Sequence, residues 1–130
     1  MNWVRFIAVM IGAGILTSMT DWFFAGDWIH RRYTYPGVWR TGGESKAIAL
    51  TSPLPFLTCA VFAFAAHQLS HPSTLRYLTF AAEVWLIGPL PLMLTNAAFI
   101  KLHRVFVTAY VIGWLVKLLI IAGAVSLFLH

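Results

Sequence analysis

Residues 105–129 read VFVTAYVIGWLVKLLIIAGAVSLFL, and Lys117 is the one charged side chain among them. A helix needs roughly 20 apolar residues to cross the hydrocarbon core of a bilayer, so this stretch is long enough to span a membrane. Three further stretches of similar length and composition precede it, at about residues 3–24, 47–69 and 75–100. The sequence therefore predicts an all-α integral membrane protein, in which residues 1–130 form a single domain, a four-helix bundle.

The composition also indicates that lipid is the main solvent of this chain. Hydrophobic residues make up 60% of the 130 residues and charged residues only 10%, whereas soluble domains average roughly 45–50% and 25%. The formal net charge is +5, but the basic residues lie mostly at the ends of the apolar stretches, where they meet anionic lipid headgroups. We therefore expect the bilayer, and no nucleic acid, as a partner.

The basic residues also predict an orientation. The first and third connections carry most of them, whereas the opposite side has Arg5 and Arg76. Because Lys and Arg are enriched in cytoplasmic loops, we expect both termini outside the cytoplasm of a bacterial inner membrane. The first apolar run continues to Phe24, which favours a retained helix over a cleaved signal peptide. The basic residues of the two connections are Arg31, Arg32, Arg40, Lys46, Lys101 and Arg104.

The first connection, residues 27–46, is rich in arginine and aromatic residues. Asp27 and Arg31 are four residues apart, a spacing that allows an ion pair on a helix. The composition is typical of a segment that lies on anionic lipid headgroups. A lid over a cavity is the alternative interpretation.

Paired prolines interrupt the second and third stretches, in Ser52-Pro53-Leu54-Pro55 and Gly88-Pro89-Leu90-Pro91. The two segments resemble each other, and Pro-interrupted repeats of opposite direction can indicate a binding site near the membrane midplane. Chance recurrence of residues common in membrane helices explains so short a repeat more simply. Each proline frees the carbonyl four residues back, so we predict kinks in both helices and a partner for the carbonyls of Trp85 and Ile87.

Ionisable side chains within the spans are the strongest functional indications. Lys117 lies near the middle of the fourth span, at the depth of the freed carbonyls. It either caps that kink, or is neutral, or acts as a ligand anchor or proton carrier. Glu83 differs from it in depth by roughly 7–8 Å, so a direct pair is not favoured. We expect Glu83 to pair instead with Arg5 or His67, as a structural tie or a proton relay.

Two further polar residues are expected to join helices. Asp21 lies near the cytoplasmic end of the first span, and its candidate partners are Lys46, Lys101, His103 and Arg104. Asn96 is expected to form a hydrogen bond to a neighbouring helix.

No pattern of catalytic or metal-binding residues is recognisable in the sequence. Cys59 is the single cysteine, and His30 and His103 could face each other as haem ligands although their spacing does not require it. A phosphate-binding glycine loop and a Ser-His-Asp set are both lacking. We predict no metal and no cofactor, leave catalytic residues unassigned, and lean against an enzyme.

The stretch Trp22-Phe23-Phe24-Ala25-Gly26-Asp27-Trp28 resembles the Trp-Tyr…Phe-Gly-x-x-Trp motif of a bacterial family of small four-span proteins, domain of unknown function 1761. In this chain the small residue before the second Trp is one position nearer, and Asp21 and Asp27 flank the motif. The resemblance implies four spans, a polar-aromatic first loop and a short third loop, and it assigns no catalytic residues.

These observations favour an oligomeric membrane protein that binds or moves a small or amphiphilic ligand in an intramembrane cavity. The expected cavity includes the Pro89–Pro91 kink, and an acidic or carbonyl-bearing amphiphile would suit Lys117. The alternatives are a proton-coupled small transporter, an accessory or structural subunit, and an enzyme that modifies a lipid or quinone. The candidate ligand-binding or relay residues are Lys117, Glu83, Trp85, Asn96, His67 and Asp21.

Overall fold

The fold is taken from a computed structural model that describes residues 2–38 and 42–129. Within these ranges every regular element is a helix, and four helices are long and apolar enough to cross a membrane. The predicted fold class, an all-α bundle of four membrane spans, is therefore confirmed. The four spans are Trp3–Arg32, Ser45–His67, Thr74–Phe99 and Arg104–Phe128.

Three of the spans are divided into two helices. The elements are α1 (Trp3–Ala25) and α2 (Asp27–Arg32), α3 (Glu44–Thr51) and α4 (Leu54–His67), α5 (Thr74–Ile87) and α6 (Pro89–Phe99), and the undivided α7 (Arg104–Phe128). The predicted kinks in the second and third spans are found as interruptions, at Ser52–Pro53 and at Gly88. These are the positions at which proline removes a backbone donor and prevents the helix from continuing.

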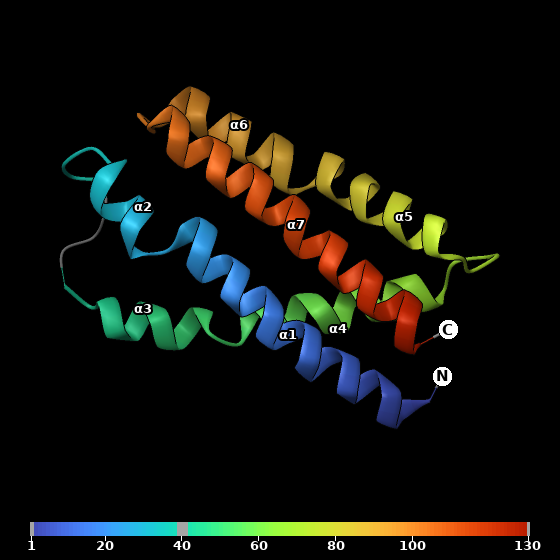
Figure 1. The fold of residues 1–130 in the computed structure, drawn as a ribbon. Coiled ribbons are helices and arrows are strands. Elements are labelled where there is room, and N and C mark those ends of the chain that lie inside the picture. The colour runs from blue at the N-terminus through green and yellow to red at the C-terminus, as the bar shows by residue number, and fades with distance from the viewer. Residues whose placement is uncertain (1, 39–41, 130) are drawn as a thin grey trace.

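The helices are arranged around a central antiparallel pair, α1 and α7 (Figure 1). The C-terminal part of the second span, α4, packs mainly against α1, while α5 and α6 follow α7. The chain begins α1 and ends α7 at the same end of the bundle, which we call the terminal end. The opposite end carries α2 and the connection between α6 and α7, and we call it the α2 end.

The best-packed part of the bundle lies toward the terminal end. Small side chains are common in this core. In lipid, helices associate mainly through van der Waals packing, and small side chains allow their backbones to approach closely. The buried cluster comprises Val9, Ala13, Cys59, Phe62, Ala63, Ala66, Tyr77, Ala81, Leu118, Ile121, Ala122 and Val125.

The crossings of α1 with α4 and α7 depend on two glycines. A Cβ atom at Gly14 would lie 2.3 Å from the Phe56 ring, and one at Gly113 would lie 2.7 Å from Cβ of Phe24.

A third interruption lies between α1 and α2, where the sequence ends the first apolar stretch at about residue 24 and begins the interfacial segment at residue 27. A Cβ atom at Gly26 would lie 1.8 Å from the carbonyl oxygen of Trp22, so a larger residue does not fit there. The indole Nε1 of Trp28 then donates a hydrogen bond to the carbonyl of Phe23 at 2.6 Å, near the end of α1. The aromatic-glycine stretch at residues 22–28 therefore has a structural role as the corner between α1 and α2.

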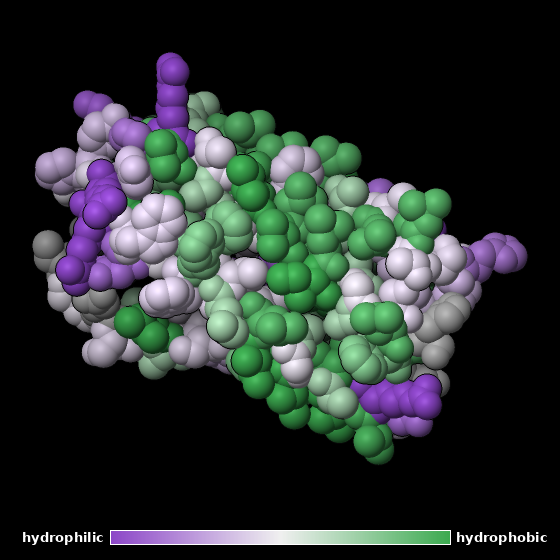
Figure 2. All heavy atoms as spheres, viewed as in Figure 1, coloured by the Kyte–Doolittle hydropathy of each residue, from purple (hydrophilic) through white to green (hydrophobic). Residues whose placement is uncertain are grey.

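The surface has an apolar band between two polar ends (Figure 2). Large apolar side chains such as Ile11, Leu57 and Leu92 are exposed on it, as expected of lipid-facing residues in a multi-pass membrane protein. In the first connection, the predicted Asp27–Arg31 ion pair is confirmed at 2.8 Å on exposed side chains of α2. Arg40 lies outside the described residues.

Candidate functional site

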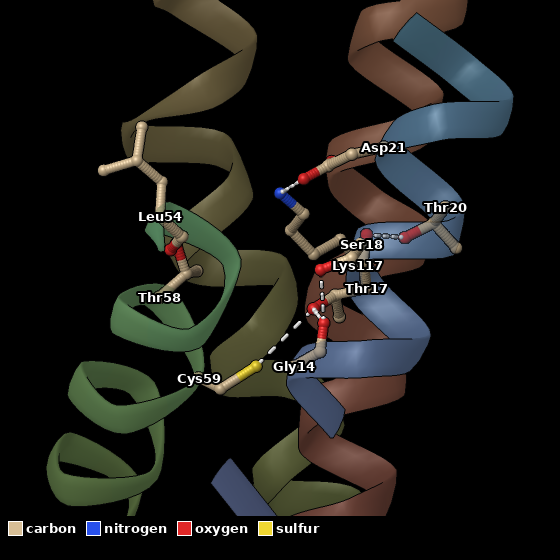
Figure 3. Close-up of polar contacts among 9 residues, drawn as sticks. All are labelled: Gly14, Thr17, Ser18, Thr20, Asp21, Leu54, Thr58, Cys59 and Lys117. Carbon is tan, nitrogen blue, oxygen red and sulfur yellow. Dashed lines mark hydrogen bonds and ion pairs between the residues drawn. The ribbon is translucent and has the colours of Figure 1, made fainter. Parts of the chain in front are cut away.

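A charged pair joins α1 to α7 within the bundle (Figure 3). The Nζ atom of Lys117 lies 2.5 Å from Oδ2 of Asp21, and the side chains are 5% and 40% exposed, respectively. The predicted partners of both residues were therefore wrong. Among the described residues, Lys117 pairs with Asp21 and not with the carbonyls of Trp85 and Ile87, and Asp21 has no ion pair with Lys46, Lys101, His103 or Arg104. A lysine side chain leans toward the N-terminus of its helix, and α1 reaches its C-terminal turns on that side of Lys117.

Hydroxyl and thiol groups continue this polar contact along α1. Thr17 Oγ1 donates to the carbonyl of Gly14 at 3.1 Å and lies 3.6 Å from Sγ of Cys59 in α4. Ser18 donates to the same carbonyl at 2.7 Å, and Thr20 donates to the carbonyl of Thr17 at 2.7 Å. The hydroxyl groups are thus bonded to their own helix, and Lys117 and Asp21 supply the only charges in this seam among the described residues.

Glu83 pairs within its own helix, so its predicted partners were also wrong. Its carboxylate lies 2.8 Å from the guanidinium of Arg76, and both side chains are substantially exposed. Among the described residues, no ion pair or hydrogen bond joins Glu83 to Arg5 or His67. Arg76 lies seven residues before Glu83, which is two helical turns, and so shares its face of α5.

Trp85 ties two helices together. Its indole Nε1 donates a hydrogen bond to the carbonyl of Val111 in α7 at 2.9 Å. The side chain is partly buried against the core of the bundle. Trp85 therefore serves α5–α7 packing in the structure.

A groove of about 1040 Å³ separates α4 from α5 and α6. The helix α7 forms its floor, since α4 packs mainly on α1. Phe62 of α4 and Phe80 of α5 both line the groove, and their ring centroids are 5.1 Å apart. The walls are largely apolar. The lining residues are Val38, Leu57, Thr58, Val61, Phe62, Ala65, Phe80, Val84, Ile87, Gly88, Pro89, Leu92, Met93, Asn96, Ile100, Leu102, Phe106, Tyr110, Trp114 and Leu118.

Polar side chains in the groove are few. The hydroxyl of Thr58 is bonded to the carbonyl of Leu54 at 2.9 Å. The Asn96 amide and the Tyr110 hydroxyl line the groove, and neither side chain has a hydrogen bond within the part of the chain that the structure describes. The helix-to-helix hydrogen bond predicted for Asn96 is therefore not found.

The groove includes only part of the cavity expected from the sequence. Pro89 and Asn96 line it, whereas Lys117, Glu83, Trp85 and the other candidates do not. Sequence reasoning missed the floor, which consists of Phe106, Tyr110, Trp114 and Leu118. Their spacing of four residues places them along one face of a helix and could have identified them together.

Trp114 connects the groove to the charged pair. Its ring lines the groove, and its centroid lies 4.4 Å from Nζ of Lys117. The ion pair therefore lies directly behind the floor of the groove without being part of its surface.

The structure brings together no metal site at the α2 end. Among the described residues, no group of three or more His, Cys, Asp and Glu side chains could hold a metal ion. The ring of His103 lies 5.2 Å from that of Tyr33, and His103 Nδ1 accepts a hydrogen bond from the backbone of Val105 at the start of α7. The ring of His30 lies 6.0 Å from that of Phe106. Each histidine thus packs against aromatic rings.

Comparison of the chain with protein-family models, curated proteins and solved structures finds no match. The resemblance to domain of unknown function 1761 therefore stays a prediction.

Proposed function

We propose that this protein binds a membrane-soluble amphiphile in the groove between α4 and α6. The observation that carries the proposal is the groove itself: about 1040 Å³ of space with apolar walls, within the membrane-spanning part of the chain. Ligand sites typically have volumes of about 300–1,000 Å³, mostly apolar linings and a few polar groups that fix orientation. The groove has these properties.

The length of the groove suits a molecule with an extended apolar chain. Its floor runs from Phe106 to Leu118, a distance of roughly 18 Å at 1.5 Å per residue. That is a little over half of the hydrocarbon thickness of about 30 Å, so such a molecule would stay within one leaflet for most of its length.

The charges around the groove favour binding over catalysis or ion exchange. Tyr110 is the one titratable side chain that lines the groove among the described residues. Lys117 is already neutralised by Asp21, so it is not available to anchor an acidic amphiphile as the sequence suggested. An enzyme acting on a lipid or quinone would need a base that the groove does not present, and catalytic residues stay unassigned.

The alternative roles depend on the ion pair instead. A proton-coupled transporter would use Asp21 and Lys117 as its proton-binding groups, since Glu83 is exposed and paired with Arg76. A structural or accessory subunit would need the ion pair and the Trp85–Val111 hydrogen bond only to hold its helices together.

We also propose a location and an assembly. The basic side chains Arg31, Lys101 and Arg104 lie at the α2 end, which supports a cytoplasmic α2 end and outer termini in a bacterial inner membrane. Anionic headgroups would then contact α2, whose arginines are exposed. We also propose that the protein forms homo-oligomers.

Native mass spectrometry of the protein released from mild detergent, with an absorption spectrum of the same sample, tests this function. We expect a retained small molecule on the wild-type protein and its loss in Ala65→Trp, which fills the groove from α4. Leu92→Trp does the same from the more exposed α6 wall, in case Ala65→Trp does not fold. Ala98→Trp, on the outer face of α6, is the control and should keep the molecule. A wild-type protein without a bound molecule, or equal retention by the groove and control variants, would contradict the proposal.

A further inference from the structure

Asn96 and Tyr110, which lie toward the α2 end of the groove, have unused hydrogen-bonding capacity. The Asn96 amide offers two donors and an acceptor, and the Tyr110 hydroxyl offers one donor and an acceptor. The structure gives neither side chain a hydrogen bond to any residue that it describes, although each lies on an otherwise apolar surface. A polar group that loses water without gaining a partner is costly, so these two groups favour a ligand that supplies the partner.

The position of the two side chains fixes the direction of that ligand. Asn96 lies three residues before the end of α6, and Tyr110 lies six residues after the start of α7, so both are toward the α2 end. The groove continues from them past Trp114 to Phe62 and Phe80, where its lining is apolar. A headgroup near Asn96 and Tyr110 would therefore place an apolar chain along α7 toward the middle of the membrane.

The charges behind the floor of the groove offer no counterion to an ionised headgroup. The nearest charges behind the floor, Lys117 and Asp21, lie 2.5 Å apart and compensate each other. A carboxylate would find no free cation there. An ammonium group would find no free carboxylate, and one face of Trp114 is already occupied by Lys117. Burying either ion without a counterion is strongly unfavourable.

From these observations we infer that the groove selects amphiphiles whose headgroup is uncharged and carries a hydroxyl or carbonyl oxygen, recognised by Asn96 and Tyr110. The inference rests on the proposed function and adds the chemical class of the ligand. A carbonyl oxygen would accept hydrogen bonds from the amide and the phenol. A hydroxyl group would also donate one to the oxygen of either side chain.

Photolabelling of the full-length protein in lipid nanodiscs tests this inference. The probes carry the same diazirine-labelled alkyl chain with one of four headgroups: a primary alcohol, a methyl ketone, a carboxylate or a trimethylammonium group. Cross-links are located by peptide mass spectrometry. We expect the alcohol and the ketone to label the groove about tenfold more than the two ionised probes, since a lost charge partner or hydrogen bond typically costs enough for such a factor. A stronger signal from the alcohol than from the ketone would show that the ligand also donates a hydrogen bond.

Variants separate the headgroup inference from the proposed function. Asn96→Leu and Tyr110→Phe should reduce the preference for the uncharged probes while the groove is still labelled. Thr95→Val, on the exposed side of α6 and outside the groove, should leave the preference unchanged. Labelling that concentrates in the groove with no preference among the four probes would overturn the inference and leave the proposed function standing. Labelling spread evenly over the lipid-facing helices would overturn the proposed function as well.

Discussion

The Nζ atom of Lys117 lies 2.5 Å from Oδ2 of Asp21, so a single ion pair joins residues 96 positions apart in the chain. It links α1 to α7, the two helices at the centre of the bundle. The lysine is almost completely buried, and its charge is acceptable in an apolar environment only because the carboxylate is there.

Removing one member of this pair should destabilise the protein strongly. We expect Lys117→Met to lower the free energy of unfolding by about 3 kcal/mol, because Asp21 keeps a charge without a partner. The double variant Lys117→Met/Asp21→Leu should regain most of that loss, since a buried pair can often be replaced by apolar residues. Unfolding in mixed detergent micelles measures both values.

The exposed Asp27–Arg31 pair offers a matched control for this cycle. Arg31→Met should change the unfolding free energy by about 0–1 kcal/mol, because exposed ion pairs contribute little. If Lys117→Met and Lys117→Met/Asp21→Leu were equally destabilised, the contribution of Lys117 to stability would come from side-chain packing and not from its charge.

The closest approach of α1 and α7 should depend on Gly113. Gly113→Ala places a methyl group 2.7 Å from Cβ of Phe24, so the helices must separate, and we expect a loss of about 1–3 kcal/mol in stability. Gly123, on the same helix, has open space around it, and Gly123→Ala should be neutral or stabilising because alanine favours the helix by up to about 1 kcal/mol. Thermal unfolding of the two variants in one detergent compares them directly. Similar losses at both positions would argue against the crossing as described.

The hydrogen bond from Trp85 to Val111 should have a measurable effect on the α5–α7 contact. Trp85→Phe keeps an aromatic ring but removes the indole donor, and we expect a loss of about 0.5–1.5 kcal/mol. Trp22 is 72% exposed, and Trp22→Phe should leave stability within experimental error. Chemical unfolding followed by far-UV circular dichroism reports both variants, and an unchanged Trp85→Phe protein would be inconsistent with this hydrogen bond.

Glu83 should not act as a proton relay. It is exposed and paired with Arg76, so Glu83→Gln should change stability by about 0–1 kcal/mol and leave ligand retention unchanged between pH 5 and 8. Retention measured by native mass spectrometry across that range tests this expectation. If Glu83→Gln abolished a pH-dependent flux in vesicles, Glu83 would be a proton relay and this prediction would be wrong.

The fold could be predicted because its determinants are local. The length of each apolar stretch and the requirement for internal hydrogen bonds in lipid indicate helices, and the prolines at residues 53 and 89 mark the interruptions. The end of the first apolar stretch at about residue 24 also indicates the break before α2, but the reason that glycine is needed at residue 26, the nearby carbonyl of Trp22, is visible only in the structure.

The candidate site was less predictable, because the ion pair and the groove depend on how the four spans are arranged relative to one another. Residue counting placed Asp21 beside the basic loops, but it neglected the length and direction of the Lys117 side chain. The groove lies between α4 and α6, which are not neighbours along the chain, so the groove itself depends on tertiary structure.

The groove also determines how its occupant would be supplied. Leu57, Val61 and Leu92 line it and are more than half exposed, so it opens sideways among the acyl chains and not into water. Occupancy would therefore follow the mole fraction of the ligand in the surrounding bilayer, and its concentration in the aqueous buffer would have little effect. We therefore expect the amount of retained ligand to rise with the amount of native lipid that the mild detergent leaves around the protein.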